Sequence, residues 1–248
     1  MSSLLVVSHP GHELRLHHWL EVERPEVFVL TDGSGSTMRS RMASTRRLIE
    51  GAGSTLALQS GERTDAEMYT ALRTQDRAFF RAIFDAISNL MARADVDTVV
   101  CDAVEGYNTS HDLCFQLVLS AVRAQRRPIL VRDFLLVGRP DTIPTGECTV
   151  HRLDEQALQR KLDAASHYPE LAAEIQSAVE IFGREAFATE VLRHVGNPSV
   201  PIPPPSLPPY YETYGEKRVR EGVYSMVIRH EIHVGPMSEE IWKWADGV

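Results

Sequence analysis

The stretch "LLVVSHPGHE", residues 4–13, decides the fold and places the first candidate site. The apolar run at residues 4–8 stops at His-Pro-Gly, which is typical of a buried strand in a parallel sheet, because such strands are apolar on both faces. Apolar residues at helical spacing follow at once and predict a helix over residues 11–22. A buried strand that runs directly into a helix is the first half of a βαβ unit.

The same alternation of strand and helix continues along the first half of the chain. Strands that alternate with helices imply right-handed crossovers, so we expect an α/β fold with a Rossmann-like, mainly parallel sheet and helices on both faces. Further strands are predicted at residues 26–33, 54–60, 96–102 and 127–135, and further helices at residues 38–53, 66–94 and 111–125.

The second half has a different pattern. Residues 153–195 are predicted to be helical, and residues 197–215 hold seven of the fourteen prolines, which favours an extended segment with polyproline II character. Because the tail lacks a strand pattern of its own, we expect a Rossmann-like catalytic core over residues 1–150. A helical, Pro-rich C-terminal extension over residues 151–248 should pack on it within one structural domain.

The Pro-rich segment is expected to lie against the core or against a partner subunit. Val200, Ile202 and Leu207 punctuate the prolines of residues 197–209, whereas a free linker would be polar. A homo-oligomer is therefore compatible with the sequence, which does not itself fix the oligomeric state.

Composition excludes several classes of protein. The chain has 248 residues, of which 43% are hydrophobic and 24% charged, as in ordinary globular proteins. Its net charge of -8 argues against nucleic acid as a partner, because phosphate binding needs a basic surface. Three cysteines do not form a disulfide framework, which favours a reducing compartment. With no signal-peptide pattern and no membrane-length apolar run, we expect a cytoplasmic protein without a membrane span.

Polar residues follow three of the predicted parallel strands. His9 follows the first strand, Thr31-Asp32-Gly33 ends the second, and the loop of residues 105–111 follows the strand at residues 96–102. The carboxyl ends of parallel strands meet at one edge of the sheet, where ligands bind in such folds. The sequence therefore predicts a functional site at this edge.

His9, His12 and His111 are the candidate metal ligands at this edge. Two nearby imidazoles and a third from a distant loop are typical of catalytic zinc sites, which keep one position open for water. Zn²⁺, or another divalent transition metal, is the expected cofactor. The alternative is that His9 ends the strand while His12 lies on a solvated helix face, since H-x-x-H is a short and common pattern.

Four segments in order resemble the LmbE/PIG-L-like zinc deacetylases, a family that includes sugar N-deacetylases. "VVSHPGHE" is similar to the family's A-H-P-D-D-E signature, and "VLTDGSGS" to its T-D-G loop. Arg41, followed by Ala52-Gly53, matches an R-x-x-E…L-G helix, although Ser44 stands where Glu is usual. "EGYNTSHD" is similar to an H-P-D-H segment. The resemblance spans roughly residues 4–135.

The resemblance implies roles for several residues, and some of these residues differ from those usual in the family. It places His9, His12 and His111 at metal-ligand positions, with His12 where the family has Asp. The family's general base aligns with Gly11, which has no side chain, and the His that polarises the substrate carbonyl aligns with Asn108. Asn108 can still donate a hydrogen bond to an oxyanion.

Because Gly11 stands at the position of the family's general base, another carboxylate would have to take that role. Asp32 and Glu105 are the better candidates, and together with Asn108 they form the predicted catalytic set. Arg41 and Tyr107 are predicted to bind substrate. If the chain is a hydrolase that lost its base, an aspartate restored at position 11 is expected to raise amidase activity, unless Gly11 needs a backbone conformation that a side chain forbids.

Two functions compete at this point. The first is a divergent metal-dependent hydrolase of the LmbE/PIG-L type that acts on an N-acylated amino sugar or a related small amide. Its partner would be a small, sugar-containing substrate. The second is a non-hydrolytic relative, either a metal- or ligand-binding scaffold or an enzyme of different reaction, because the base position is Gly11. A nucleotide-binding enzyme is disfavoured, since the sequence lacks a proper glycine fingerprint.

Overall fold

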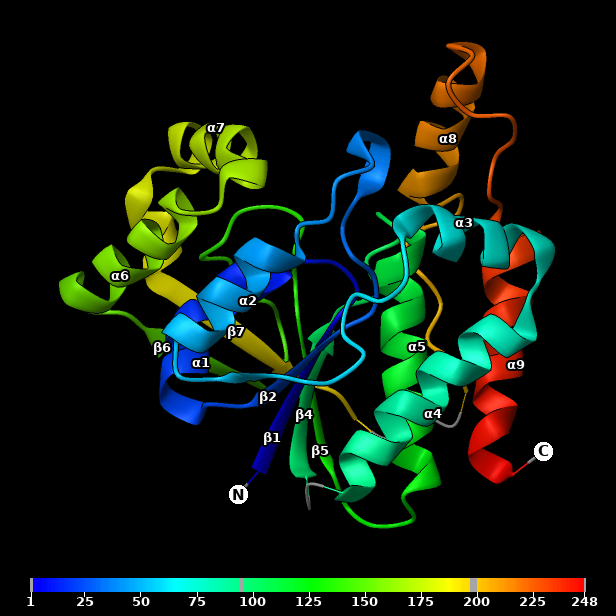
Figure 1. The fold of residues 1–248 in the computed structure, drawn as a ribbon, viewed down its shortest axis with the longest axis horizontal. Coiled ribbons are helices and arrows are strands. Elements are labelled where there is room, and N and C mark those ends of the chain that lie inside the picture. Colours follow the sequence, from blue (N-terminus) through cyan, green and yellow to red (C-terminus); the bar gives the residue numbers. More distant parts are fainter. Residues whose placement is uncertain (1, 94–95, 197–199, 248) are drawn as a thin grey trace.

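The computed structural model describes residues 2–93, 96–196 and 200–247, and its centre is a seven-stranded sheet with helices on both faces (Figure 1). The strands lie in the order β3-β2-β1-β4-β5-β7-β6. The strands are β1 (Ser2–Val7), β2 (Glu26–Val29), β3 (Thr55–Leu56), β4 (Val96–Asp102), β5 (Leu130–Phe134), β6 (Cys148–Arg152) and β7 (Thr189–His194). The helices are α1 (His17–Glu23), α2 (Met42–Gly51), α3 (Asp65–Thr74), α4 (Arg77–Arg93), α5 (Thr109–Ala124), α6 (Glu155–Ser166), α7 (Ala172–Phe182), α8 (Tyr210–Arg220) and α9 (Gly235–Lys243).

The predicted α/β fold is confirmed, and the five strands of the first half run parallel. β1 pairs with β2 on one side and with β4 on the other, so the chain changes direction across the sheet between these two neighbours. This is the topological switch point, where the loops that leave the carboxyl ends of strands separate and open a crevice. His9 follows β1 there, and the loop of residues 103–108 follows β4.

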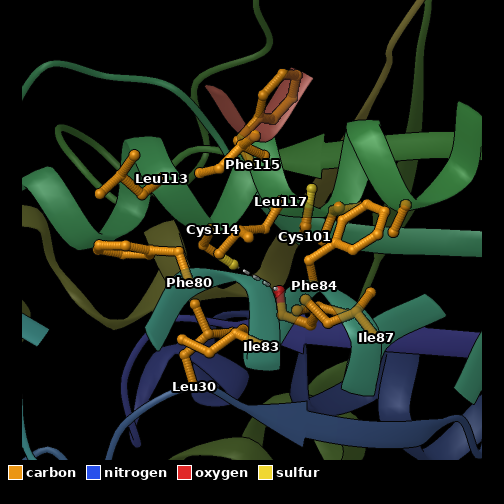
Figure 2. Close-up of a cluster of buried hydrophobic side chains, with 14 of the residues drawn as sticks. Leu30, Phe80, Ile83, Phe84, Ile87, Cys101, Leu113, Cys114, Phe115 and Leu117 are labelled. Atoms are coloured by element: carbon orange, nitrogen blue, oxygen red, sulfur yellow. Dashed lines mark hydrogen bonds between the residues drawn. The ribbon is translucent and has the colours of Figure 1, made fainter. Parts of the chain in front are cut away.

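Alternate residues of each central strand enter separate cores. Leu4 and Val6 of β1 join the cluster beneath α3, α4, α5 and α9, whereas Leu5 and Val7 join the cluster beneath α1 and α2. Figure 2 shows the first of these, in which Phe80, Ile83, Phe84 and Ile87 of α4 pack near Leu113 and Leu117 of α5. Buried apolar clusters therefore cover both faces of the sheet, as the apolar strands predict.

Three predicted elements differ from the structure. Residues 189–194, predicted as helix, form β7, because the buried Glu190 interrupts the apolar pattern that would have revealed a strand. The helix over residues 66–94 is split into α3 and α4 at Gln75, whose φ is 53° and whose side-chain amide donates to the carbonyls of Leu72 and His233. The strand at residues 54–60 is reduced to the two residues of β3, at the sheet edge.

The C-terminal half is tied to the sheet and to the candidate site. β7 pairs antiparallel with β5 and with β6, and the predicted domain boundary at residue 150 falls inside β6. The Pro-rich segment contacts the core at points within residues 200–209, where Gln116 Nε2 donates to the Ile202 carbonyl at 2.6 Å and Pro204 and Pro209 pack over Gly106. Val200 and Leu207, which were expected to dock together with Ile202, are instead 62% and 70% exposed. Residues 197–199 of that predicted docking segment lie outside the described residues.

No helix in the described ranges is both long enough and apolar enough to cross a lipid bilayer.

A buried carboxylate on β7, Glu190, pairs with Lys161 of α6 and accepts hydrogen bonds from the start of α1. The Glu190 carboxylate accepts hydrogen bonds from the backbone N–H groups of His18 and Trp19, both at 2.9 Å, and from Lys161 Nζ at 2.8 Å. Glu190 is 1% exposed and Lys161 5% exposed. Glu190 thus satisfies the first N–H groups of a helix that has no side-chain cap of its own.

We expect Glu190→Gln to lower the free energy of unfolding by about 3 kcal/mol, because it leaves the buried Lys161 ammonium unpaired and turns an amide N–H₂ toward donors. Urea denaturation monitored by circular dichroism measures the change. The matched control is Glu155→Gln, which breaks an exposed ion pair with Arg184 and should cost less than about 0.5 kcal/mol. Equal midpoints for the two variants would contradict the role given to Glu190.

Candidate functional site

Three imidazoles from separate elements meet at the switch point. His9 follows β1, His12 begins the short 3-10 helix His12–Leu16, and His111 lies in the first turn of α5. Their ring centres are separated by 5.4 Å for His9 and His12, 5.5 Å for His9 and His111, and 4.6 Å for His12 and His111. Three imidazoles that share one tetrahedral zinc ion at the usual Zn–N distance have ring centres roughly 5 Å apart. The observed separations are close to that value.

His12 is oriented by a buried carboxylate. Asp102, the last residue of β4, is completely buried, and its Oδ2 lies 2.9 Å from His12 Nδ1 while accepting from the Ser8 backbone N–H and hydroxyl. Burial alone would raise the pKa of Asp102, but the adjacent His12 and the Ser8 hydroxyl hold it well below its usual range. A carboxylate oxygen only accepts, so Nδ1 of His12 carries a proton and Nε2 is the nitrogen left to face a ligand. Burial alone would lower the pKa of His12, but the ionised Asp102 raises it, so a metal ion would compete with a proton for Nε2.

His9 has a similar support from α3. Its Nδ1 lies 2.8 Å from Thr31 Oγ1 and 3.1 Å from Asp65 Oδ1. Burial opposes ionisation of Asp65, but His9, Thr31 and the Gly35 N–H together hold its pKa well below the usual range. Because the ionised Asp65 accepts, Nδ1 of His9 is the proton-bearing nitrogen here too, which leaves Nε2 of His9 free as a ligand atom.

His111 differs from the other two, because no carboxylate among the described residues accepts a hydrogen bond from its Nδ1. It is 6% exposed, and its buried Nδ1 has no hydrogen-bond partner among the described residues. Burial, together with His12 nearby, lowers the pKa of His111 well below its usual value, so this imidazole is neutral. A neutral imidazole with an unpartnered buried nitrogen is able to serve as a metal ligand.

As the side chains stand, no three His, Cys, Asp or Glu residues in the described ranges are arranged to hold a metal ion. The ring separations nevertheless fit a shared ion, and Asp102 and Asp65 leave Nε2 of His12 and His9 available. Because His111 makes no hydrogen bond through Nδ1, its ring can turn without breaking one. A small rotation of one ring moves its nitrogen atoms far more than it moves the ring centre.

Leu171 and Tyr168 occupy the space beside Gly11. Gly11 has φ +106°, and a Cβ built there would overlap Leu171 Cδ1 and lie 3.8 Å from Tyr168 Oη. Glu13 is buried beneath this turn and accepts from the Gly11 N–H at 2.8 Å and from Thr45 Oγ1 at 2.7 Å. Gly11 is therefore required by the backbone, and the expectation that an aspartate at position 11 would restore activity is not supported by this geometry.

The predicted replacement carboxylates hold loops in place. Asp32 Oδ1 accepts from the Ser34 N–H at 2.9 Å, and the Glu105 carboxylate accepts from the N–H groups of Leu136 and Val137 at 2.8 and 3.1 Å. Burial raises the pKa of Glu105 above its ordinary value. Within the described chain, neither carboxylate has a hydrogen bond to any of the three histidines, although the charge of Glu105 is among the causes that raise the pKa of His12.

Asn108 begins α5 as its cap. Its Oδ1 accepts from the Ser110 N–H at 2.8 Å, which leaves the Nδ2 donors without a protein acceptor in the described residues. Asp112 braces the preceding turn by accepting from the N–H groups of Glu105 and Gly106. The loop that carries Asn108 to the switch point is therefore fixed at both ends.

The two predicted substrate residues lie on different loops. Tyr107 is 46% exposed and stacks on Tyr210 of α8 with ring centres 4.9 Å apart and an interplanar angle of 3°. Tyr210 stacks in turn on Tyr214, so three tyrosines form an exposed ladder. Arg41 precedes α2, and its backbone N–H donates to the Asp32 carbonyl at 2.8 Å.

Sequence reasoning missed the two carboxylates that support the histidines. Asp102 stands at the carboxyl end of a predicted strand, at the same edge of the sheet as the histidines, and this position could have identified it as a site residue. Asp65 opens α3 directly after the Thr64 capping box, where an acidic residue is expected for helix reasons alone. Nothing in the local sequence of Asp65 indicates its contact with His9.

No family model matches the sequence, and no curated protein matches it. Among solved structures the fold is similar to an A40926 pseudoaglycone deacetylase, with a TM-score of 0.53, 17% identity, and coverage of 79% of this chain and 98% of that one. It is also similar to a triple mutant of a deacetylase of the teicoplanin biosynthetic pathway, with a TM-score of 0.54, 12% identity, and coverage of 80% and 99%. A deacetylase–teicoplanin complex is similar with a TM-score of 0.53 and 10% identity, and the match covers 79% of this chain and 100% of that one. At these identities the similarity establishes the fold.

Proposed function

We propose that this chain is a divergent metal-dependent hydrolase of the LmbE/PIG-L type that removes the acyl group from an N-acylated amino sugar or a related small amide. The observation that carries the proposal is the meeting of His9, His12 and His111 at the switch point, with ring centres 4.6–5.5 Å apart. The fold shared with an A40926 pseudoaglycone deacetylase and with a deacetylase of the teicoplanin biosynthetic pathway supports it.

His9, His12 and His111 would hold the metal, with Zn²⁺ favoured by three nitrogen ligands. A zinc ion bound there would act as a Lewis acid toward a substrate carbonyl and toward water. Asp102 and Asp65 orient His12 and His9 and fix the proton on Nδ1 of each ring. One structural neighbour is a zinc-inhibited form of a teicoplanin deacetylase, so that protein interacts with zinc.

The side chains around the histidines would position an acylated sugar. The free Nδ2 group of Asn108 would donate a hydrogen bond to the carbonyl oxygen as negative charge develops on it. The exposed rings of Tyr107 and Tyr210 offer a flat surface against which a sugar ring can pack. Arg41 would contact an anionic or polar group of the substrate. We assign proton transfer to Glu105 or Asp32, which lie on loops at the same edge of the sheet.

A second function is favoured by one observation. Leu171 fills the space beside Gly11 in which the family's general base would stand. This arrangement suits a non-hydrolytic relative that binds a metal or a small ligand, or an enzyme whose reaction needs no carboxylate at that position.

Metal loading and acetate release distinguish the two functions. We expect zinc-loaded protein to release acetate from at least one member of a panel of N-acetylated amino sugars, with no release after chelation and recovery when zinc is returned. Asn108→Ala is expected to lower kcat about 10²-fold, as loss of an oxyanion donor does, while leaving metal content unchanged. A protein that binds metal but releases no acetate from any panel member supports the second function and contradicts the first.

A further inference from the structure

Helix α7 is an apolar helix that lies on the surface without burying any of its side chains. Seven of its eleven residues are apolar, yet none is buried, and Ile181 near its end is 68% exposed. Together with Phe182 and the small residues Ala173 and Ala178, Ile181 lines a shallow hollow on the surface. A helix of this composition normally packs against another element. Within the described chain, the outer face of α7 is left without such a covering.

Helix α8 presents a face of complementary chemistry. Tyr210 and Tyr214 lie on its outer side and are 49% and 40% exposed, and Arg220 continues the same stripe at the end of the helix. Arg220 is exposed and has no carboxylate within ion-pair distance among the described residues, and its Nε donates to the carbonyl of Glu216 in its own helix at 3.4 Å. The outer face of α8 is therefore aromatic at its start and positively charged at its end.

The spacing of apolar and charged residues on α7 matches the reverse order on α8. On α7, Glu174 is exposed, has no basic partner within ion-pair distance in the described ranges, and precedes Ile181 by seven residues. On α8, Tyr214 precedes Arg220 by six residues. At a rise of about 1.5 Å per residue, each separation is roughly 10 Å. Antiparallel packing therefore sets Ile181 on Tyr214 and Glu174 beside Arg220, and it also aligns the helix dipoles favourably.

The two matching helices of one chain do not meet each other. Figure 1 shows α7 and α8 on opposite sides of the carboxyl edge of the sheet. A two-fold rotation that lays α7 of one copy on α8 of another brings the reciprocal pair of helices together as well, so the same contact forms twice. A stable interface buries about 800 Å² on each partner, and the repeated contact doubles the area that one pair of eleven-residue helices contributes.

We propose that this chain forms a two-fold homodimer in which α7 of each copy packs antiparallel on α8 of the other. Ile181 packs on the partner's Tyr214, and Glu174 pairs with the partner's Arg220. The apolar contact provides most of the affinity, and the ion pair selects the antiparallel register, because exposed ion pairs stabilise little by themselves. The contact leaves the Tyr107 ring to the substrate. The dimer does not rest on the proposed hydrolase activity, because it uses neither the three histidines nor a metal.

Sedimentation equilibrium of the full chain over a range of concentrations measures the dissociation constant of the dimer. We expect a reversible equilibrium between monomer and dimer. Ile181→Asp should raise the dissociation constant at least about 100-fold, because a charge replaces an apolar contact twice in each dimer. Glu174→Arg and Arg220→Glu should each raise it about tenfold, since like charges then face each other at both contacts. The control Glu23→Arg, at an exposed glutamate that ends α1, should dimerise like the wild type.

The double variant Glu174→Arg with Arg220→Glu exchanges the two charges and should return the dissociation constant to within about threefold of the wild-type value. Because the substituted side chains are exposed, each variant should keep the wild-type circular dichroism spectrum, which separates loss of the dimer from loss of the fold. The proposal is overturned if the wild type stays monomeric at the highest soluble concentration, or if Ile181→Asp dimerises as tightly as the wild type. Two weakened single variants without recovery in the double variant would overturn the pairing of Glu174 with Arg220 and the antiparallel register.

Discussion

Replacement of His111 by alanine is expected to reduce bound divalent metal from about one ion per chain to less than about a tenth of that, because two imidazoles rarely retain zinc in a site built for three. Loss of a group that merely supports a ligand costs 10–100-fold in metal affinity, and loss of a ligand should cost at least as much. Elemental analysis of protein purified without added metal, and again after zinc loading and dialysis, gives the occupancy directly.

Two further variants make the metal measurement specific. His167→Ala removes an exposed histidine whose Nδ1 bonds locally to its own helix, and it should leave occupancy at the wild-type level. Asp102→Asn keeps the three imidazoles but weakens the support of His12, so its occupancy should fall between the two. If His111→Ala and the wild type hold equal metal, His111 is not a ligand, and the proposed function loses the observation on which it depends.

Gly11→Asp is expected to lower the free energy of unfolding by about 2–4 kcal/mol and to leave amidase activity no higher than that of the wild type. Part of the cost is backbone strain, because a φ of +106° is rarely adopted by a residue with a side chain. The remainder is the overlap with Leu171, for which overpacking costs of about 1–3 kcal/mol are usual. Urea denaturation gives the stability, and acetate release gives the activity.

Two companion variants separate strain from overlap. Gly146→Asp carries a matched φ of +109° but has no atom within 4 Å of its added Cβ, so it should show the strain alone. The double variant Gly11→Asp with Leu171→Ala should recover part of the stability lost by Gly11→Asp, because the overlap has been removed. Wild-type stability of Gly11→Asp would show that Leu171 yields easily, and the base position would then be open to a carboxylate.

Much of the sheet follows from local patterns, and the exceptions have physical reasons. The apolar strands at residues 2–7 and 96–102 are buried on both faces, so their composition alone marks them. β7 was not predicted as a strand, because a charged residue, Glu190, occupies one of its buried positions and pairs there with Lys161. The break between α3 and α4 at Gln75 was not predicted either, because the amide of Gln75 donates to the His233 carbonyl, which lies 158 positions away in the sequence.

The histidine cluster was predictable for a topological reason. Carboxyl ends of adjacent parallel strands share one edge, so His9 and the loop before His111 had to approach each other once the strand order was established. The carboxylates behind the rings and the group beside Gly11 were not predictable, because they depend on contacts between distant segments. Leu171 reaches Gly11 from a connection between α6 and α7, and no periodicity in either segment indicates that meeting.

The order of strands at the antiparallel edge has a consequence for biosynthesis. β6 pairs with β7 in the described sheet, and β7 is what joins it to β5, so β6 has no place in the sheet until residues 189–194 have left the ribosome. The intervening segment contains Leu171, which completes the surroundings of Gly11. During vectorial synthesis the five parallel strands can therefore assemble first. The contact between Leu171 and the Gly11 turn is expected to form late, after β7 has paired with β5 and β6.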